Sequence, residues 1–180
     1  MKLLIASDIH GSAYYCEKLL DVYKKEKADR LVLLGDILYH GPRNDLPKDY
    51  APKKVIEMLN TLKDEILCVR GNCEAEVDQM VLDFPCLSDY CLLCIDDKTI
   101  FVTHGHTYNL NNLPPLKKGD ILLHGHTHIP SWDKFNDDNY YLNPGSTSIP
   151  KSDSLHSYMT YENGHFYWKN LLNGEVYHTL

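Results

Sequence analysis

The stretch His124-Gly125-His126-Thr127-His128 places three histidines within five residues, directly after the apolar run Ile121-Leu122-Leu123. A similar cluster, His104-Gly105-His106, stands twenty positions upstream and follows the apolar run Ile100-Phe101-Val102. Histidine is the commonest metal ligand because its ring is largely neutral near physiological pH. A strand that ends in histidine delivers the ring to the carboxyl edge of a sheet, where open α/β sheets bind their ligands. Both clusters therefore predict functional positions rather than a purification tag, which would lie at a chain terminus.

The composition is that of an ordinary globular protein. The chain has 180 residues, of which 43% are hydrophobic and 24% charged, so we predict a single domain over residues 1–180. The net charge of −7 argues against tight nucleic-acid binding, because that affinity comes from neutralising phosphates with Lys and Arg. No run is long enough to span a membrane, and Asp8 and His10 come too early for a signal peptide. We therefore expect a cytoplasmic protein without membrane partners.

The six cysteines are too sparse for a disulfide scaffold, which is consistent with a reducing compartment. Cys91 and Cys94 have a spacing found in zinc and redox sites, but they lie in a strand-like run. Side chains alternate between the two faces of a strand, so positions three apart point in opposite directions. No second cysteine pair has zinc-ribbon spacing. We therefore predict that both are small core residues.

The first half of the chain has the pattern of parallel β-α-β units. Apolar strands are predicted at residues 2–7, 30–34 and 66–69, with amphipathic helices between them. Ser12 is positioned to cap the first helix, and Pro52 suits the first turn of the second. A short third helix is expected to direct its apolar residues inward; these are Val77, Met80 and Val81.

The second half, from Cys86, is predicted to be mainly antiparallel. Asn163-Gly164 marks a clear hairpin, and residues 175–180 are a candidate edge strand. We expect each half to build one sheet and the two sheets to face each other with helices outside. The aromatic-rich segment 158–168 is typical of either a dimer face or a strand core, which leaves a homodimer or higher homo-oligomer open.

Seven candidate metal ligands fall at the ends of predicted strands. They are Asp8, His10, Asp36, Asn72, His104, His126 and His128. One divalent transition-metal ion takes roughly four to six ligands, some of them water, so this set suits two ions. Asp36 is the natural bridge, because its two oxygens can each face one cation. The mixed His, Asp and Asn set without thiolates favours manganese, iron or catalytic zinc over structural zinc.

A pair of metal ions about 3.5–4 Å apart is an arrangement that hydrolyses phosphate esters. The metal charge offsets the repulsion between the phosphoryl group and a nucleophile. A water held between two cations loses its proton near neutral pH and becomes a hydroxide nucleophile. The sequence therefore predicts a hydrolase of phosphate esters.

The order of these motifs resembles the calcineurin-like metallophosphoesterase superfamily. The matching segments are Asp8-Ile9-His10, Gly35-Asp36, Gly71-Asn72, Thr103-His104-Gly105-His106 and Gly125-His126-Thr127-His128. Three further segments are similar to those of the YfcE-like phosphodiesterases. They are His40-Gly41-Pro42-Arg43-Asn44, Arg70-Gly71-Asn72-Cys73-Glu74 with Glu76-Val77-Asp78-Gln79-Met80, and Asn143-Pro144-Gly145-Ser146 followed by Ile149-Pro150-Lys151.

This resemblance implies an α/β fold, a four-layer α/β/β/α sandwich of two facing mixed sheets. It also implies a phosphodiesterase that acts on a small phosphodiester through a dinuclear metal-activated hydroxide. The implied cofactors are two divalent ions, with manganese preferred and iron, zinc or nickel as alternatives. The implied ligand sets are Asp8, His10, Asp36 and His128 for one ion, and Asp36, Asn72, His104 and His126 for the other.

Four further residues are candidates for catalysis or substrate binding. Many superfamily members carry a histidine after Gly-Asn as proton donor, and here that residue is Cys73. A thiol of pKa ~8.5 is a poorer acid than imidazole at neutral pH, so we expect slow turnover on poor leaving groups, unless Cys73 merely packs under the site. His106 is a second candidate for proton donation or phosphate contact. Arg43, with Asn44 beside it, offers a bidentate fork for a phosphate oxygen.

Each of these candidates also has a simpler interpretation. His106 would then be a solvated loop residue, Arg43 would stabilise its loop, and His124 is expected to pack rather than bind metal. Two other functions are a catalytically weak protein-binding scaffold of the same fold and a nuclease. The intact ligand set weighs against the scaffold, and the acidic balance weighs against the nuclease.

Overall fold

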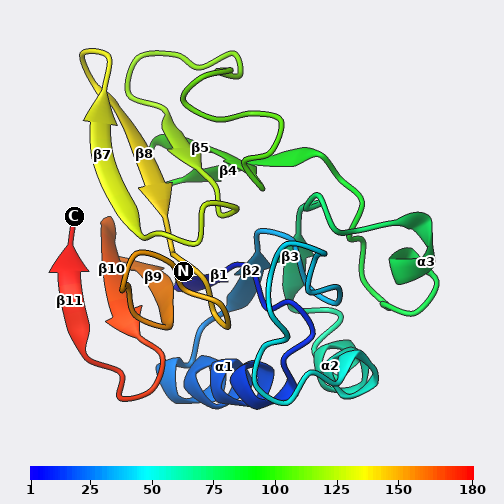
Figure 1. The fold of residues 1–180 in the computed structure, drawn as a ribbon. Helices are drawn as coiled ribbons and strands as arrows, with labels where there is room; N and C mark the ends of the chain where they lie inside the picture. Colours follow the sequence, from blue (N-terminus) through cyan, green and yellow to red (C-terminus); the bar gives the residue numbers. More distant parts are fainter.

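Two β-sheets face each other, and the two longer helices lie along one side of the pair (Figure 1). The computed structural model describes residues 1–180. The helices are α1 (Ala13–Glu26), α2 (Pro52–Asn60) and α3 (Glu76–Gln79). The strands are β1 (Leu3–Ala6), β2 (Arg30–Leu33), β3 (Ile66–Cys68), β4 (Tyr90–Ile95), β5 (Lys98–Thr103), β6 (Ile121–Leu123), β7 (Ser131–Phe135), β8 (Asn139–Asn143), β9 (Ser157–Glu162), β10 (His165–Asn170) and β11 (Val176–Thr179).

The first sheet has six strands in the order β11-β10-β9-β1-β2-β3. Strands β1, β2 and β3 are parallel, which confirms the predicted β-α-β units. The C-terminal strands are antiparallel and join this same sheet, because β9 pairs with β1. The prediction that each half builds its own sheet is therefore wrong. A strand as buried as β1 needs a partner on each side, and the end of the chain returns to provide one.

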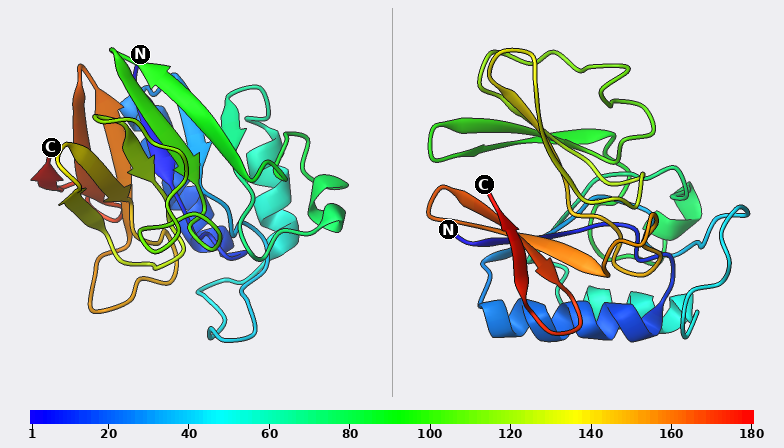
Figure 2. Two further views of the ribbon diagram at one scale, coloured as in Figure 1. Left: turned by 90° about the horizontal axis from the view of Figure 1, so that it is seen from above. Right: turned by 60° about the vertical axis from the view of Figure 1, so that its left-hand side comes forward.

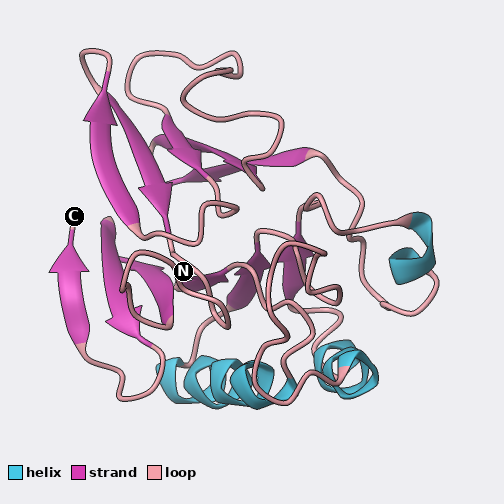
Figure 3. Ribbon diagram, viewed as in Figure 1, coloured by secondary structure: helices cyan, strands magenta, loops and turns pink.

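The second sheet has five strands in the order β4-β5-β6-β8-β7. Its three central strands are parallel, and β4 and β7 pair antiparallel at the two edges. The edge strand β7 was not expected, since its sequence is mostly polar and exposed. The sandwich of two facing mixed sheets is confirmed. Figures 2 and 3 show that loops, rather than helices, lie over the second sheet.

Two layers of apolar side chains hold this arrangement together. One core of 21 buried residues lies between the first sheet and the helices, and it includes Leu19 and Leu20 of α1 and Leu59 of α2. A second core of 15 buried residues lies between the sheets. Four aromatic side chains near the C-terminus are buried in these two cores, so they are core residues of their strands and not an exposed dimer face. They are Tyr158, Tyr161, Phe166 and Trp168.

The predicted helix ends are also confirmed. Oγ of Ser12 accepts a hydrogen bond from the backbone N–H of Tyr15 at 3.3 Å, which caps α1. Pro52 occupies the first turn of α2. None of the three helices is long and apolar enough to cross a membrane.

Two predictions about core residues are wrong. Val77, Met80 and Val81 are exposed by 64%, 82% and 42%, because the single turn of α3 stands away from both sheets. Cys91 and Cys94 do point to opposite faces of β4, but only Cys91 packs against the core between the sheets. Cys94 is exposed on the outer face of this edge strand. All six cysteines are free thiols.

Candidate active site

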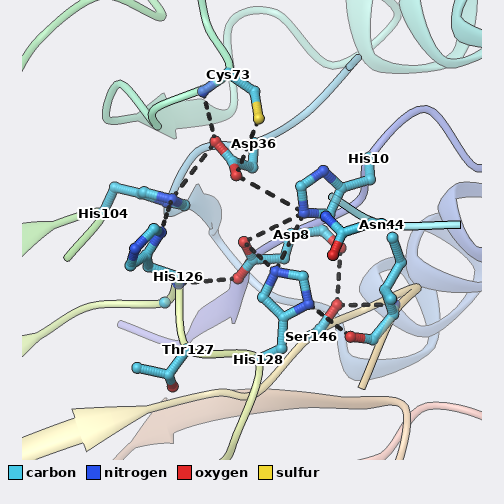
Figure 4. Close-up of polar contacts among 12 residues, drawn as sticks. Asp8, His10, Asp36, Asn44, Cys73, His104, His126, Thr127, His128 and Ser146 are labelled. Atoms are coloured by element: carbon cyan, nitrogen blue, oxygen red, sulfur yellow. Dashed lines mark hydrogen bonds and ion pairs between the residues drawn. The ribbon is translucent and has the colours of Figure 1, made fainter. Parts of the chain in front are cut away.

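The seven predicted ligands converge where five strands end. Asp8 and His10 follow β1, Asp36 follows β2 and Asn72 follows β3 in the first sheet. Across the gap, His104 follows β5, and His126 and His128 follow β6 in the second sheet. Figure 4 shows the side chains of Asp8, His10, Asp36, His104, His126 and His128 pointing toward one another.

One group of donors is built from Asp8, His10 and His128, all buried. Oδ1 of Asp8 lies 3.3 Å from Nε2 of His128 and 3.6 Å from Nε2 of His10. The two Nε2 atoms are themselves 3.3 Å apart. Despite these short distances, Oδ1 of Asp8 accepts no hydrogen bond, although it is fully buried. A buried carboxylate oxygen without a hydrogen-bond partner is costly unless a cation binds it.

A second group is built around Asp36, His104 and His126, with Asn72 beside it. Nε2 of His104 lies 3.4 Å from Oδ1 of Asp36, 3.1 Å from Oδ1 of Asn72 and 3.1 Å from Nδ1 of His126. The other oxygen of Asp36, Oδ2, lies 3.7 Å from Nε2 of His10 in the first group. Asp36 therefore stands between the two groups with one oxygen toward each (Figure 4).

Backbone carbonyls orient three of the imidazole rings. The pairs are Nδ1 of His10 with Tyr39 O at 2.7 Å, His104 with Leu34 O at 2.7 Å and His128 with Ile149 O at 2.6 Å. Because a carbonyl only accepts, each Nδ1 carries a proton, and in the neutral ring Nε2 then directs its lone pair into the cluster. Metal-binding histidines are commonly held by such a hydrogen bond on the other ring nitrogen.

The electrostatics of the site keep both carboxylates charged. Burial raises the pKa of Asp8, but its interactions with His10 and His128 outweigh this and hold the pKa well below its usual range. Burial likewise raises the pKa of Asp36, and the contact with His104 reverses the effect. Burial and the charge of His104 lower the pKa of His126 to about 4. Two anionic carboxylates among imidazole nitrogens form a donor set that fits divalent cations.

Five of the seven side chains project from a left-handed backbone. The φ angles are 59° at Asp8, 50° at His10, 55° at Asp36, 66° at His126 and 62° at His128. Asp and His tolerate this region better than most residues, but each such residue still costs on the order of 1 kcal/mol or more. This clustering was not foreseen in the sequence, since no local pattern of residues requires it.

Glu74 is a structural part of the site to which its sequence pattern assigned no role. Its buried carboxylate accepts backbone N–H bonds from Asp36 at 2.9 Å, Ile37 at 2.8 Å and Gly71 at 2.5 Å. Burial and the charge of Asp36 raise the pKa of Glu74. A Cβ at Gly71 would collide with Asp36. This packing joins the ends of β2 and β3 and sets the position of Asp36.

The end of β8 and the segment after it hold Asp8 and the turn of His126 and His128 in place by hydrogen bonds. The hydroxyls of Ser146 and Ser148 each donate to the carbonyl of Asp8 at 3.0 Å. The amide of Asn143 donates to the carbonyl of Gly125 at 2.9 Å. Gly125 is required for close approach, because a Cβ there would collide with Ser7 and Asp8. The turn that carries His126 and His128 is thus fixed against the end of β1.

The remaining candidates lie around this cluster. Arg43 and Asn44 line a cavity of about 440 Å³ that opens onto Asp36, His126 and His128. The ring of His106 is exposed, and its centroid lies 5.5 Å from that of His104.

Cys73 lies against Asp36, and His124 packs away from the ligand cluster. Sγ of Cys73 is 3.3 Å from Oδ2 of Asp36, and its backbone N–H donates to Oδ1 at 2.9 Å. Burial and the charge of Asp36 raise the pKa of the Cys73 thiol. His124 is buried and stacks on Tyr141 with centroids 4.4 Å apart, so its predicted packing role is confirmed.

Two facing mixed sheets whose strand ends gather two adjoining groups of Asp and His side chains define a metallophosphoesterase. Residues 1–164 match the calcineurin-like phosphoesterase superfamily domain, and the chain belongs to this superfamily. It is thus an enzyme of the phosphoesterase class, as the motif order predicted.

Individual relatives agree with this assignment. The chain is 45% identical over 163 residues to phosphodiesterase YfcE of Escherichia coli, covering 91% of this chain and 88% of that protein. The solved structure of Yfce, described as a phosphoesterase from E. coli, superposes with a TM-score of 0.96 at 42% identity, covering 100% of this chain and 98% of that one. Phosphodiesterase MJ0936 of Methanocaldococcus jannaschii is 25% identical over 163 residues, covering 83% of this chain and 89% of that protein.

Proposed function

We propose that the protein hydrolyses small phosphodiesters with two divalent metal ions bound on either side of Asp36. The observation that carries this proposal is the placement of Asp36, whose Oδ1 faces His104 and whose Oδ2 faces His10. Similarity to YfcE and MJ0936, both named as phosphodiesterases, supports a diester rather than a monoester as substrate.

The proposed ligand sets share Asp36 and follow the two groups of donors. They are Asp8, His10, Asp36 and His128 for one ion, and Asp36, Asn72, His104 and His126 for the other. We propose manganese as the native metal, with iron, zinc or nickel as alternatives, because imidazole and carboxylate donors accept all four. When bound, the ions would neutralise phosphoryl charge and lower the pKa of a water molecule.

The chain's own residues would bind the diester and protonate the leaving group. Arg43 lines the cavity without an ion-pair partner, so its guanidinium is available for a phosphate oxygen. Asn44 is held beside it, because its amide donates to the carbonyl of His40 at 2.8 Å. Cys73 and His106 are the two proposed proton donors. The thiol of Cys73 already donates to Asp36, so we expect efficient turnover only when the leaving group departs without protonation.

Hydrolysis of bis(p-nitrophenyl) phosphate tests the proposal directly. We expect the metal-stripped protein to be inactive, added Mn²⁺ to restore p-nitrophenol release, and Asp36→Asn to abolish the restored activity. Asp138→Asn is the matched control, since Asp138 is an exposed carboxylate in the turn between β7 and β8. Failure of the metal-loaded parent to hydrolyse any diester would overturn the proposal and favour the binding scaffold.

Three further expectations accompany this function and stay predictions. The substrate is a small molecule and not a polynucleotide, given the net charge of −7. The location is cytoplasmic, consistent with six free thiols. A homodimer or higher homo-oligomer stays open.

A further inference from the structure

The cavity beside Asp36 is lined mainly by polar residues and carries two cations at its edge. Eleven residues line its volume of about 440 Å³, and apart from Pro42 and Cys73 all of them are polar, charged or glycine. No Phe, Tyr or Trp side chain lines it, so a nucleobase would find only the imidazoles of His126 and His128 and the guanidinium of Arg43 to stack on. Arg43 and Lys151 provide the positive charge. The only acidic residue in the lining is Asp36, whose charge the proposed metal ions would neutralise.

Neither cation has a partner in the protein. Arg43 and Lys151 are exposed, and no carboxylate lies within ion-pair distance of either side chain. Elsewhere on the surface, Lys54 and Lys118 do pair with nearby aspartates. In a chain of net charge −7, two unpaired cations in one cavity form a local reversal of charge that favours an anionic ligand.

Both cations stand on anchored backbone. The N–H of Lys151 donates to the carbonyl of His128 at 3.2 Å, which ties this lysine to a proposed metal ligand. Arg43 lies in a turn closed by a 3.3 Å hydrogen bond from Asn44 N–H to Gly41 O. The backbone that carries both cations is therefore fixed beside the phosphoryl site.

A second, smaller cavity lies on the other side of His126 and Thr127, which line both cavities. Its volume is about 270 Å³, and its lining contains no Lys, Arg, Asp or Glu. Leu110 and Tyr141 make its walls less polar than those of the first cavity. The two cavities thus offer different surroundings to the two substituents of a phosphodiester bound between them.

We propose that the substrate is an asymmetric phosphodiester in which one substituent carries a second anionic group, a carboxylate or a phosphate. This group binds Arg43 and Lys151, and the other substituent is small and uncharged and occupies the second cavity. The inference rests on the proposed function and names the substrate class of that site. Because both cations are exposed, their combined effect on selectivity is about tenfold rather than several orders of magnitude.

Esters with one leaving group and different second substituents test this inference. The probes are p-nitrophenyl ethyl phosphate, its 2-carboxyethyl analogue and its 2-phosphoethyl analogue, each measured as kcat/KM with Mn²⁺. The parent is expected to prefer one or both anionic analogues by about tenfold. That ratio is expected to shrink in 0.5 M salt, because exposed charges are screened.

Variants distinguish the contribution of Arg43 and Lys151 to anion preference from that of the metal ions, which also attract anions. We expect Lys151→Gln and Arg43→Gln each to reduce the anionic-to-ethyl ratio about threefold. Lys24→Gln, which removes an exposed and unpaired lysine in the last turn of α1, should leave the ratio unchanged. A parent ratio of one or below, or a ratio unchanged in the Arg43→Gln, Lys151→Gln double variant, overturns the inference. If none of the three esters is hydrolysed, the proposed function itself fails; equal hydrolysis of all three defeats only the inference.

Discussion

Carboxylates lie near both ends of β1, half-buried at one end and buried at the other, and their charges are neutralised differently. At the start of the strand, Glu26 accepts hydrogen bonds from Lys2 and Lys169, both at 2.7 Å, and from the hydroxyl of Tyr158 at 3.0 Å. Burial raises the pKa of Glu26, but these donors outweigh it and lower the pKa to about 2. This carboxylate is neutralised entirely by the protein's own cations.

At the other end of β1, Asp8 and Asp36 have no ammonium or guanidinium partner. Their only ion-pair neighbours are the imidazoles of His10, His104 and His128, and Oδ1 of Asp8 accepts no hydrogen bond. A chain that neutralises Glu26 so completely is able to place lysines near β1. The contrast indicates that the negative charge of Asp8 and Asp36 is balanced by bound metal cations and not by side chains of the protein.

The strongest test of this contrast removes one carboxylate from each end. Asp36→Ala should lower kcat/KM by at least about 100-fold, because even partners that only orient metal ligands are worth roughly 10- to 100-fold. It should also abolish the rise in Tm that Mn²⁺ causes in the parent. Glu26→Gln should keep both the activity and the metal-induced rise. If the Glu26 variant lost the metal response instead, the contrast between the two ends would be wrong.

A smaller effect is expected at Glu74, which holds Asp36 without facing the cavity. Glu74→Gln replaces one acceptor oxygen by an N–H₂ donor and leaves at least one of the backbone N–H groups of Asp36, Ile37 and Gly71 without an acceptor. We expect Mn²⁺ affinity, measured by calorimetry, to fall by about 10- to 100-fold. Glu74→Asp is the conservative partner. Rescue of metal affinity by this variant would indicate positioning through the carboxylate, whereas unchanged affinity in Glu74→Gln would contradict the role.

The pH dependence of stability gives a third test, at the Glu26 end. Because the folded pKa of about 2 lies below the unfolded value of about 4.3, this group stabilises the fold fully above the unfolded pKa. The stabilisation is lost as the pH falls through the folded pKa. At pH 7, Glu26→Gln should lower the free energy of unfolding by roughly 1–3 kcal/mol, measured in urea on metal-free protein. A difference from the parent that stayed constant down to the folded pKa would exclude this origin.

The contrast also explains how much of the site was predictable. Asp8, His10 and His126 were found because polar residues directly after apolar strands have few structural uses. Glu74 was not, since its role depends on backbone N–H groups of Asp36 and Ile37 that are remote in sequence. Lys151 belongs to a segment that carries the resemblance, but the sequence assigned it no role, because only the folded chain brings it to the cavity of Arg43.

The fold divides in the same way. Local periodicity predicted α1, α2 and the hairpin at Asn163-Gly164, each of which depends on nearby residues. It failed for the partner of β1, because pairing with β9 joins residues more than 150 positions apart. It also failed for Val77 and Met80, since an apolar pattern does not reveal whether a surface lies beneath it.

The smallest predicted effect concerns Cys73, whose thiol is the only side-chain group that donates a hydrogen bond to Asp36. Cys73→His would place a better general acid beside the leaving group, because imidazole titrates nearer neutral pH than a buried thiol. We expect about a tenfold gain in kcat for phosphodiesters of alkyl alcohols and no gain for p-nitrophenyl esters, whose leaving group needs no proton. Cys73→Ser is the control, since it keeps a donor to Asp36 without adding an acid. An equal response of all esters to Cys73→His would show that Cys73 only packs against Asp36. The proton for the leaving group would then come from another residue, and His106 is the other proposed donor.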